Sequence, residues 1–578
     1  SSSYGQSDQG PRCARHGQRE GSDDGLVRRI QSVFNRPHFV LIRNGAFYWV
    51  LFLSAQALSI SIRTVMARKV LFLLSIFSFL SFSSVFADEP SAKEGDGFIE
   101  NLDKSIEEKF EPISTKIQDI VFYAIPVSTD ADGNPVKVPW VLGWLGIAAI
   151  VFTVYFKFVN FRSWKLAFQT VKGKYSSSTD PGEITHFQAL TAALSGTVGL
   201  GNIAGVAVAV GIGGPGATFW MILMGLFGMA SKFCECTLGV KYRQIENGKV
   251  YGGPMQYLTR GLGEMGLGSL GTMLAFLFAI LCIGGSFGGG NMYQANQACS
   301  QLIEVTGGEV SFFSSNRWVF GLIMGLAVGL VIIGGIKSIA QVTAALVPFM
   351  CGIYMLAAFI VIFSNFGEVG NAFGLIFQGA FAPTAVGGGI VGVLIQGIKR
   401  AAFSNEAGIG SAPIAHSAVK TKFAASEGIV ALLEPFIDTV IVCTTTALVI
   451  VMAGTYDTPG LEGVAITSAA FEGAISWFPI VLAVAVILFA FSTMISWSYY
   501  GMQAWAHIFG RSKAAELVYK LIFCCFVVIG ASMSLGSVIG FSDAMIFAMS
   551  VPNVIAMYLL MPKVKEEYAR FLDHTRSQ

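Results

Sequence analysis

Residues 195–205 read Ser-Gly-Thr-Val-Gly-Leu-Gly-Asn-Ile-Ala-Gly and lie within the apolar segment 187–213. Glycine costs a helix about 1 kcal/mol relative to alanine. Three glycines and one asparagine within the seven residues 199–205 therefore predict that the helix unwinds there. Ten to fifteen residues, counted from the start of the segment at ~1.5 Å each, place this break near the middle of a hydrocarbon layer about 30 Å thick.

A second stretch of the same kind occurs at 403–413, which reads Phe-Ser-Asn-Glu-Ala-Gly-Ile-Gly-Ser-Ala-Pro within the segment 386–422. From Gly410 to Lys420 the chain has about ten residues, or ~15 Å of helix, so this break is also predicted near the midplane. Lys399 and Arg400 would then lie one turn outside it. Alternatively, these two residues mark the cytoplasmic end of the helix, and 404–413 is a loop.

Unwound backbone at membrane depth is tolerated only where it lines protein or a watery cavity. Each predicted break lies in the first segment of a five-segment group, 187–364 or 386–562, a pattern typical of an inverted repeat with a binding site between its halves. Half-helix N-termini attract a carboxylate, and exposed carbonyl groups suit Na⁺. For one glycine-rich helix alone, close packing between helices would be the simpler interpretation.

Composition supports a membrane protein. The 578 residues are 53% hydrophobic and 13% charged, whereas about 25% of the residues of a soluble domain are charged. The net charge of +2 does not indicate a nucleic-acid partner. We therefore predict an all-α polytopic protein with eleven transmembrane helices, most of them near the ~20 residues needed to span a bilayer. The predicted segments are 139–158, 187–213, 216–238, 269–292, 318–336, 341–364, 386–422, 424–452, 479–503, 514–535 and 540–562.

Basic residues are concentrated in alternate loops, which predicts the orientation, because short cytoplasmic loops are rich in Lys and Arg. The predicted external loop 453–478 has no Lys or Arg, and 293–317 has only Arg317. The predicted cytoplasmic loops contain Lys157, Arg162, Lys165, Lys172, Lys174, Lys241, Arg243, Lys249, Arg260, Lys337, Lys420, Lys422, Arg511, Lys513 and Lys520.

The N-terminal region reads as a leader. Residues 66–87 have a basic start, an apolar run and a small-residue cleavage site, which is typical of a signal peptide, although an uncleaved helix is the alternative. We interpret residues 1–65 as an upstream extension and 88–138 as an extracytoplasmic segment. The transporter domain is then 139–562 and the cytoplasmic tail 563–578. This places a multi-pass protein in the inner membrane, with its mature N-terminus outside.

Polar residues within spans are costly and often functional. Glu434 and Asp438 lie four residues apart in the eighth segment, and Ser492 and Thr493 lie in the middle of the ninth. The hydroxyl groups could bind Na⁺ or bond back to their own helix. Arg400 and Glu406 could form a gate pair or a static salt bridge.

Other polar residues are interpreted more simply. Asn291 and Gln294 share a face at the outer end of the fourth segment if its helix continues, whereas Asn296 and Gln297 are expected in a solvated loop. The cysteines, Cys443 among them, are assigned no chemistry. His186, His416 and His507 lack metal-ligand spacing, and no catalytic motif is found.

Several longer motifs resemble the alanine or glycine:cation symporter family. They begin at Gly199 (GLGNIAGV), Gly213 (GGPGATFWM), Tyr251 (YGGPMQY) and Phe403 (FSNEAGIGSAPIAH) and occur in the family's order over roughly 139–562. One departure is Ile222, where the family usually has a second Trp. The resemblance implies a leucine-transporter-type 5+5 inverted-repeat bundle with one extra N-terminal span, and sodium-coupled, sometimes proton-coupled, uptake of alanine or glycine.

The resemblance also implies roles for individual residues. The motif at 198–202 is similar to the first-helix motif of sodium-coupled neurotransmitter transporters, in which backbone groups and the Asn bind substrate and Na⁺. The substrate-binding residues implied are Thr197, Gly199, Gly201, Asn202, Gln294, Phe403, Ser404 and Asn405. The Na⁺ ligands expected are Val198, Asn202, Ser492 and Thr493, the last two by fold analogy.

The gating or coupling candidates are Arg400, Glu406, Glu434 and Asp438. No cofactor is expected besides Na⁺ as the coupling ion. Proton coupling through Glu406, Glu434 or Asp438 is an alternative, and a channel is a more remote one, because no filter loop is recognised.

Overall fold

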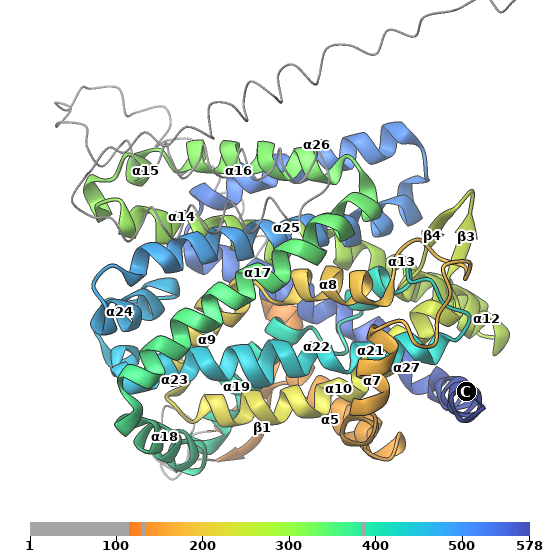
Figure 1. Ribbon diagram of the computed structural model, residues 1–578, viewed down its shortest axis with the longest axis horizontal. Helices are drawn as coiled ribbons and strands as arrows, with labels where there is room; N and C mark the ends of the chain where they lie inside the picture. Colours follow the sequence, from red (N-terminus) through yellow and green to blue (C-terminus); the bar gives the residue numbers. More distant parts are fainter. Residues whose placement is uncertain (1–111, 113–114, 130–134, 383–388, 578) are drawn as a thin grey trace, which may run out of the picture. The chain divides into compact units, whose positions relative to one another are not determined.

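The first broken helix is present as predicted from 195–205. Thr185 caps helix α8 (His186–Thr197) through a capping box with Gln188. The helix ends where the glycines begin, and after a short 3-10 turn, η2 (Leu200–Asn202), the chain continues as α9 (Ala204–Gly213). The two halves are bent by 57°, and they lie near the centre of the bundle in Figure 1.

The second break is also present and is buried. Helix α19 (Gly389–Asn405) ends before Glu406, and the short α20 (Ala412–His416) follows six residues later. All residues from 401 to 419 are buried. Arg400 lies inside α19 and is buried, so the alternative in which Lys399 and Arg400 mark the end of this helix is wrong.

The computed structural model describes residues 112, 115–129, 135–382 and 389–577, all within one unit that spans 64–578. The predicted extension 1–65 and signal peptide 66–87 lie outside the described residues, as does most of 88–138. The part of that segment that is described includes the hairpin of β1 (Ala124–Thr129) and β2 (Pro135–Pro139), which leads into α5.

Helices make up nearly all of the rest. The other main helices are α5 (Trp140–Tyr155), α10 (Ala217–Lys241), α13 (Gly268–Phe287), α14 (Tyr293–Val305), α16 (Arg317–Ile332), α17 (Gly335–Ser364), α21 (Ala424–Ala431), α22 (Leu433–Pro435), α23 (Thr444–Ala453), α25 (Phe478–Phe509), α26 (Lys513–Ser532) and α27 (Leu535–Arg576). Smaller connecting elements are α6 (Val159–Arg162), α7 (Trp164–Val171), β3 (Gln244–Glu246), β4 (Lys249–Tyr251), α11 (Pro254–Gln256), α12 (Leu262–Glu264), α15 (Phe312–Ser315), α18 (Val369–Phe381) and α24 (Val464–Ala474).

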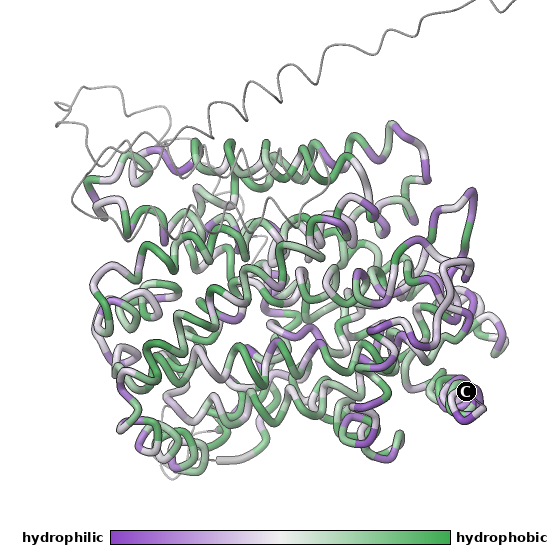
Figure 2. Tube along the Cα trace, in the orientation of Figure 1, coloured by the Kyte–Doolittle hydropathy of each residue, from purple (hydrophilic) through white to green (hydrophobic). Residues whose placement is uncertain are grey.

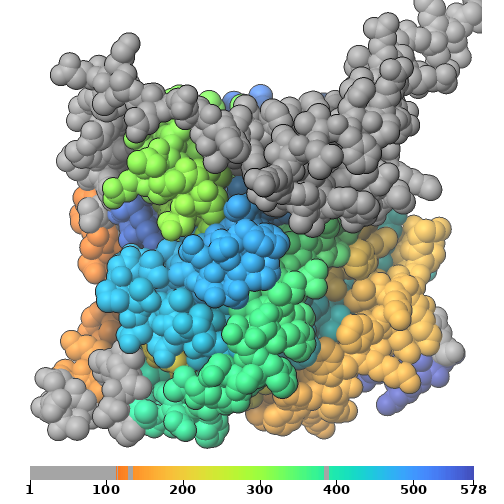
Figure 3. Space-filling view, turned by 60° about the vertical axis from the view of Figure 1, so that its left-hand side comes forward, coloured from red at the N-terminus to blue at the C-terminus, as the bar shows by residue number. Residues whose placement is uncertain are grey.

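Among the described residues, seven helices are long and apolar enough to cross a membrane, or eight if α8 with η2 and α9 is one span. The apolar helices α5, α16 and α24 are shorter. Figure 2 shows hydrophobic residues along most of the helices and hydrophilic residues gathered around β3, β4 and the C-terminal end of α27. Figure 3 shows segments far apart in the sequence, coloured orange, green and blue, sharing one face.

Packing joins the two predicted five-segment groups. Helix α10 packs against α19 and α21, and α13 packs against α25 and α27. Helix α8 packs against α17 and α25, so the first broken helix is enclosed by both groups. Two of the central helices contain π-helical turns, at Gly288–Met292 between α13 and α14 and at Phe436–Cys443 between α22 and α23.

One boundary prediction was wrong. The fourth segment does not end at 292, because the π-helical turn widens the helix without ending it, and α14 continues to Val305. Asn296 and Gln297 are therefore buried and not in a solvated loop. Asn296 donates to the carbonyl oxygen of Met533 at 2.6 Å, and Gln297 accepts from the Val464 N–H at 3.1 Å.

The basic loops lie at one end of the bundle. Ion pairs join segments that are far apart in the sequence: Lys241 of α10 with Glu567 of α27 at 2.7 Å, Lys249 of β4 with Glu516 of α26 at 3.4 Å, and Lys422 with Asp180 at 3.4 Å. Arg243 donates to the carbonyl oxygens of Ser417 and Val419, which lie just after α20. The charge pattern that was used to predict orientation thus corresponds to one contiguous face.

Candidate functional site

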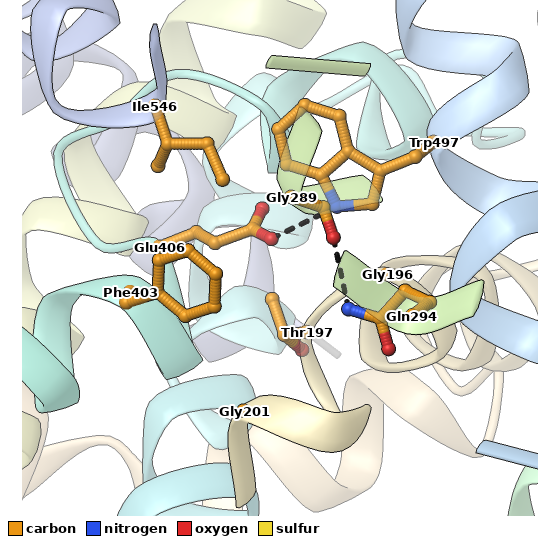
Figure 4. A pocket seen from close by; sticks show the side chains of 9 residues that line it. All are labelled: Gly196, Thr197, Gly201, Gly289, Gln294, Phe403, Glu406, Trp497 and Ile546. Carbon is orange, nitrogen blue, oxygen red and sulfur yellow. Dashed lines mark hydrogen bonds between the residues drawn. The ribbon is translucent and has the colours of Figure 1, made fainter. Parts of the chain in front are cut away.

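A small cavity lies between the two breaks (Figure 4). Its volume is about 10 Å³, about the room that a single water molecule needs, so the cavity is nearly closed in this conformation. Its lining residues come from α8, η2, α14, α19, α25 and α27. They also come from the π-helical turn at Gly288–Met292 and from the second break. They are Gly196, Thr197, Gly201, Gly289, Gln294, Phe403, Glu406, Trp497 and Ile546.

The first break redirects its backbone hydrogen bonds to side chains. The Gly199 N–H donates to Asn202 Oδ1 at 2.9 Å, and the Leu200 N–H donates to Gln294 Oε1 at 3.1 Å. In a continuous helix these N–H groups would bond to the carbonyl oxygens of Ser195 and Gly196. Those two oxygens therefore lose their helical donors at the end of α8, beside the cavity.

The second break is held by an unusual backbone conformation. Glu406 has φ 55°, and Gly408 and Gly410 have φ 81° and 93°. A left-handed conformation is costly for a residue with a side chain and tends to occur at functional positions. The Ala407 N–H donates to Asn405 Oδ1 at 3.0 Å and not to the carbonyl oxygen of Phe403, so this oxygen also loses its helical donor.

Glu406 connects the break to the cavity wall. Its carboxylate accepts from Trp497 Nε1 at 3.0 Å, as Figure 4 shows, and from the Ser411 hydroxyl group. The expected gate pair of Arg400 with Glu406 is wrong. Arg400 instead donates to Asp543 Oδ2 at 2.7 Å, and Lys399 pairs with the same carboxylate at 2.9 Å. The sequence-based pairing missed Asp543 because it is 143 residues away in α27.

A second polar group surrounds Asp438, next to the cavity. Asn202 Nδ2 donates to Asp438 Oδ1 at 2.6 Å, and the hydroxyl groups of Ser404 and Thr439 donate to Asp438 Oδ2 at 2.8 and 2.7 Å. Cys443, which was assigned no chemistry, lies 3.3 Å from both Asn202 Nδ2 and Ser404 Oγ. Residues at both breaks thus meet at one buried carboxylate.

Ser492 and Thr493 lie on α25 opposite the first break. The Ser492 hydroxyl group bonds back to the carbonyl oxygen of Phe489 at 2.9 Å. Thr493 Oγ1 is buried and has no hydrogen-bond partner among the described residues. A Cβ built on Gly199 would overlap this oxygen, so the hydroxyl group points at the unwound segment.

Most of the predicted residues fall into two groups. Thr197, Gly201, Gln294 and Phe403 line the cavity, together with Glu406. Asn202, Ser404 and Asp438 meet beside it, and Asn405 bonds to Thr439 at 3.0 Å. Glu434 is not in either group, because its carboxylate contacts Lys232 on α10 at 3.1 Å.

Sequence reasoning missed Trp497 and Ile546 as lining residues, and it missed the buried charges of α10. Trp497 is not among the residues predicted to bind the substrate. Lys232 and Glu235 lie inside the predicted segment 216–238, and two charged residues within a span were the signal that could have found them.

Comparison with known proteins gives consistent matches. The model of the Sodium:alanine symporter family matches residues 127–578. The "Sodium/alanine symporter AgcS" of Methanococcus maripaludis is 39% identical over 439 residues, which cover 75% of this chain and 94% of that protein. The "Probable sodium/glutamine symporter GlnT" of Bacillus subtilis is 33% identical, with 74% and 86% of the two chains covered.

Two further matches are a relative whose name includes proton dependence and a solved structure. The "Putative sodium/proton-dependent alanine carrier protein YrbD" of Bacillus subtilis is 34% identical, with 72% of this chain and 86% of that protein covered. Among solved structures, that of MhsT in complex with L-phenylalanine matches with a TM-score of 0.45 and 16% identity, and it covers 66% of this chain and 99% of that chain.

Proposed function

Because the chain belongs to the sodium:alanine symporter family, we propose that it carries alanine or glycine into the cell together with Na⁺, by alternating access. It is a multi-pass amino-acid:cation symporter and not an enzyme. The observation that carries the proposal is the small buried cavity between two helix breaks. The bulky rings of Phe403 and Trp497 in its lining favour a small substrate over one with a long side chain.

The cavity offers partners for each part of an amino acid. The carboxylate is proposed to bind the backbone N–H of Gly201 in η2, with Thr197 and Gln294 beside it. The ammonium group is proposed to bind the Phe403 carbonyl oxygen and the Glu406 carboxylate. Phe403, Trp497 and Ile546 line the cavity beside these groups, and they are proposed to limit the side chain to a methyl group or a hydrogen atom.

Two groups of oxygen atoms suit Na⁺, a hard cation. One is Thr493 Oγ1, whose hydroxyl group is unpaired among the described residues, with Ser492 and the carbonyl oxygen of Val198. The other is the Asp438 carboxylate with Asn202 and Ser404. The negative charge of Asp438 would compensate a bound cation in a region that excludes water.

We propose that the two breaks belong to a leucine-transporter-type 5+5 inverted repeat of eleven spans, with 187–364 and 386–562 as the two halves. This is supported by the position of both breaks in corresponding segments. The clustering of basic loops at one end supports a cytoplasmic location for that end and for the C-terminus. The mature N-terminus would then lie outside, and the domain boundaries follow the sequence-based ones.

Arg400 is proposed as an outer gate with Asp543, in place of the pairing with Glu406. The Arg400 guanidinium lies 5.6 Å from the centre of the Phe403 ring, which lines the cavity. Opening toward the outside would therefore separate Arg400 from Asp543 and move Phe403. Glu406 and Asp438, which face the substrate, remain coupling candidates.

Proton coupling is the second candidate. It is favoured by the buried carboxyl groups of Glu406 and Asp438 next to the cavity, because buried carboxyl groups can carry protons in transporters. In that case a proton gradient would drive uptake without Na⁺, and Asp438→Asn would abolish it.

Substrate and ion can be tested by binding to the purified protein. We expect labelled alanine to bind in NaCl and not in choline chloride, and to be displaced by unlabelled alanine and glycine but not by leucine. Displacement by glutamine at lower concentration than alanine would contradict the substrate proposal. Equal binding without Na⁺ would contradict the ion proposal.

A further inference from the structure

Six titratable side chains form a second buried cluster outside the cavity. They come from five helices, and none is more than 2% exposed. Ionisable groups at such depth are costly and mark ion or proton pathways by default. The members are His186 on α8, Lys232 and Glu235 on α10, His416 on α20, Glu427 on α21 and Glu434 on α22.

Their contacts form one continuous chain. Glu427 lies between two histidines: His186 Nδ1 contacts its Oε2, and His416 Nδ1 lies 2.6 Å from its Oε1. The other ring nitrogen of His416, Nε2, lies 3.4 Å from Glu434 Oε2. The chain then continues from Glu434 Oε1 to Lys232 Nζ at 3.1 Å.

Charge balance in this cluster depends on protons. Three ionised carboxylates and one lysine leave a net charge of −2 if both histidines are neutral, and zero if both are protonated. Uncompensated charge is strongly unfavourable in a buried region. Each histidine has at least one carboxylate neighbour, so protons on His186 and His416 would neutralise the cluster.

One end of the chain leads toward the basic face. His186 is the first residue of α8, and its Nε2 atom has no hydrogen-bond partner among the described residues. Arg243, which bonds to the carbonyl oxygens that follow α20, interacts electrostatically with Glu427. The proposed cytoplasmic solution therefore lies beyond His186.

The other end leads to the proposed site. Glu434 interacts electrostatically with Asp438, four residues later across the start of the π-helical turn, and with Glu406 at the cavity. A positive charge that binds at Asp438 would therefore lower the affinity of the cluster for its own protons. Coulomb interactions between buried charges are substantial where water is excluded.

Other elements packed around the cluster add few charges. Asn553 of α27 donates to Glu235 at 2.8 Å. Cys236 of α10 and Tyr500 of α25 also interact with its carboxylates, but thiol and phenol groups are ordinarily neutral at pH 7. Besides the six members, Arg243, Glu406 and Asp438 are charged side chains that face the cluster within the described chain.

We propose that the chain from His186 to Lys232 is a proton-binding site, and that it releases one proton at its His186 end when Na⁺ binds near Asp438. The Nε2 proton of His186 leaves for water. The proton that Glu427 Oε2 shares with His186 Nδ1 starts on Oε2 and moves onto Nδ1, and the Nδ1 proton of His416 moves onto Glu427 Oε1, so that His416 becomes neutral. The buried region loses one positive charge as it gains another. This inference rests on the proposed Na⁺-coupled function, and the proton moves in addition to Na⁺ rather than in its place.

The test uses the purified full-length chain in a weakly buffered solution at pH 7 with a pH-sensitive dye. Addition of NaCl with alanine should release ~1 proton per protein, whereas choline chloride with alanine should release none. His186→Gln and His416→Gln keep a hydrogen-bonding side chain but cannot hold the proton. Proton release should therefore fall below about a third of the wild-type value. His507→Gln, which changes a histidine outside the cluster, should leave it unchanged.

Parallel measurement of Na⁺-dependent alanine binding separates the outcomes. Normal binding without proton release in the wild-type chain would overturn the proton site and leave the proposed function intact. Undiminished release in both cluster variants would also overturn it. If His416→Gln does not fold, His186→Gln, at the end of the chain of contacts, decides the assignment. Loss of alanine binding in the wild-type chain under all ionic conditions would overturn both proposals.

Discussion

Gly199 faces the Thr493 hydroxyl group so closely that no Cβ fits between them. Gly199→Ala should therefore lower the kcat/KM of alanine uptake by about tenfold to a hundredfold, since overpacking of this kind costs about 1–3 kcal/mol. Gly143→Ala is the matched control, because a Cβ at Gly143 meets no atom within 4 Å. Normal uptake by the Gly199 variant would mean that the first break does not hold the substrate.

Asp438 accepts hydrogen bonds from both broken helices. An asparagine in its place could still accept hydrogen bonds but would lack the negative charge. Asp438→Asn should raise the Na⁺ concentration needed for half-maximal uptake at least about tenfold, because the loss of one partner of a buried charge pair costs about 2–5 kcal/mol. Asp457→Asn, on an exposed loop, serves as the control. An unchanged Na⁺ dependence would remove Asp438 from the ion site.

At the residue scale, the sequence predicted which residue types mattered but not all of their partners. Thr197, Gly201, Gln294 and Phe403 were predicted from motifs, and they line one cavity. The partner of Arg400 could not be predicted, because Asp543 comes from a helix that is distant in the sequence. Such pairings depend on the packing of α19 against α27, which no local pattern encodes.

At the element scale, helix α10 contributes a buried lysine to the packing of the bundle. Lys232→Met should remove the lysine partner of Glu434, leave it with His416 alone, and lower the free energy of unfolding by about 3–5 kcal/mol. Lys232→Met combined with Glu434→Gln should lose less, because the carboxylate that lost its lysine partner is then absent. Thermal unfolding of the detergent-solubilised variants measures both, and equal losses in the single and double variants would contradict a paired charge.

The helix breaks were predictable and the π-helical turns were not. Glycines and an asparagine signal a break because they weaken a helix or offer local hydrogen bonds. The triplet Gly288–Gly290 has the same composition but only widens the helix, since Trp497 packs where a Cβ of Gly290 would lie. Tertiary packing therefore decided between a break and a widened turn, and α14 continued where a loop was expected.

At the scale of the whole molecule, ion pairs join the basic loops at one end. Cysteines introduced at Asn247, in the turn between β3 and β4, and at Gly308, after α14, should react with a membrane-impermeant thiol reagent from opposite sides. In intact cells the Gly308→Cys variant should be labelled and the Asn247→Cys variant only after permeabilisation, with the parent chain as the background control. The reverse pattern would invert the proposed orientation.

The central claim is that an inward Na⁺ gradient drives accumulation of a small neutral amino acid. Liposomes containing the purified chain should accumulate labelled alanine above the external concentration when Na⁺ is imposed outside, and glycine should compete. Replacement of Na⁺ by K⁺, or collapse of the gradient with a Na⁺ ionophore, should abolish accumulation. Accumulation of the same size without Na⁺, driven by a pH gradient alone, would contradict sodium-coupled symport.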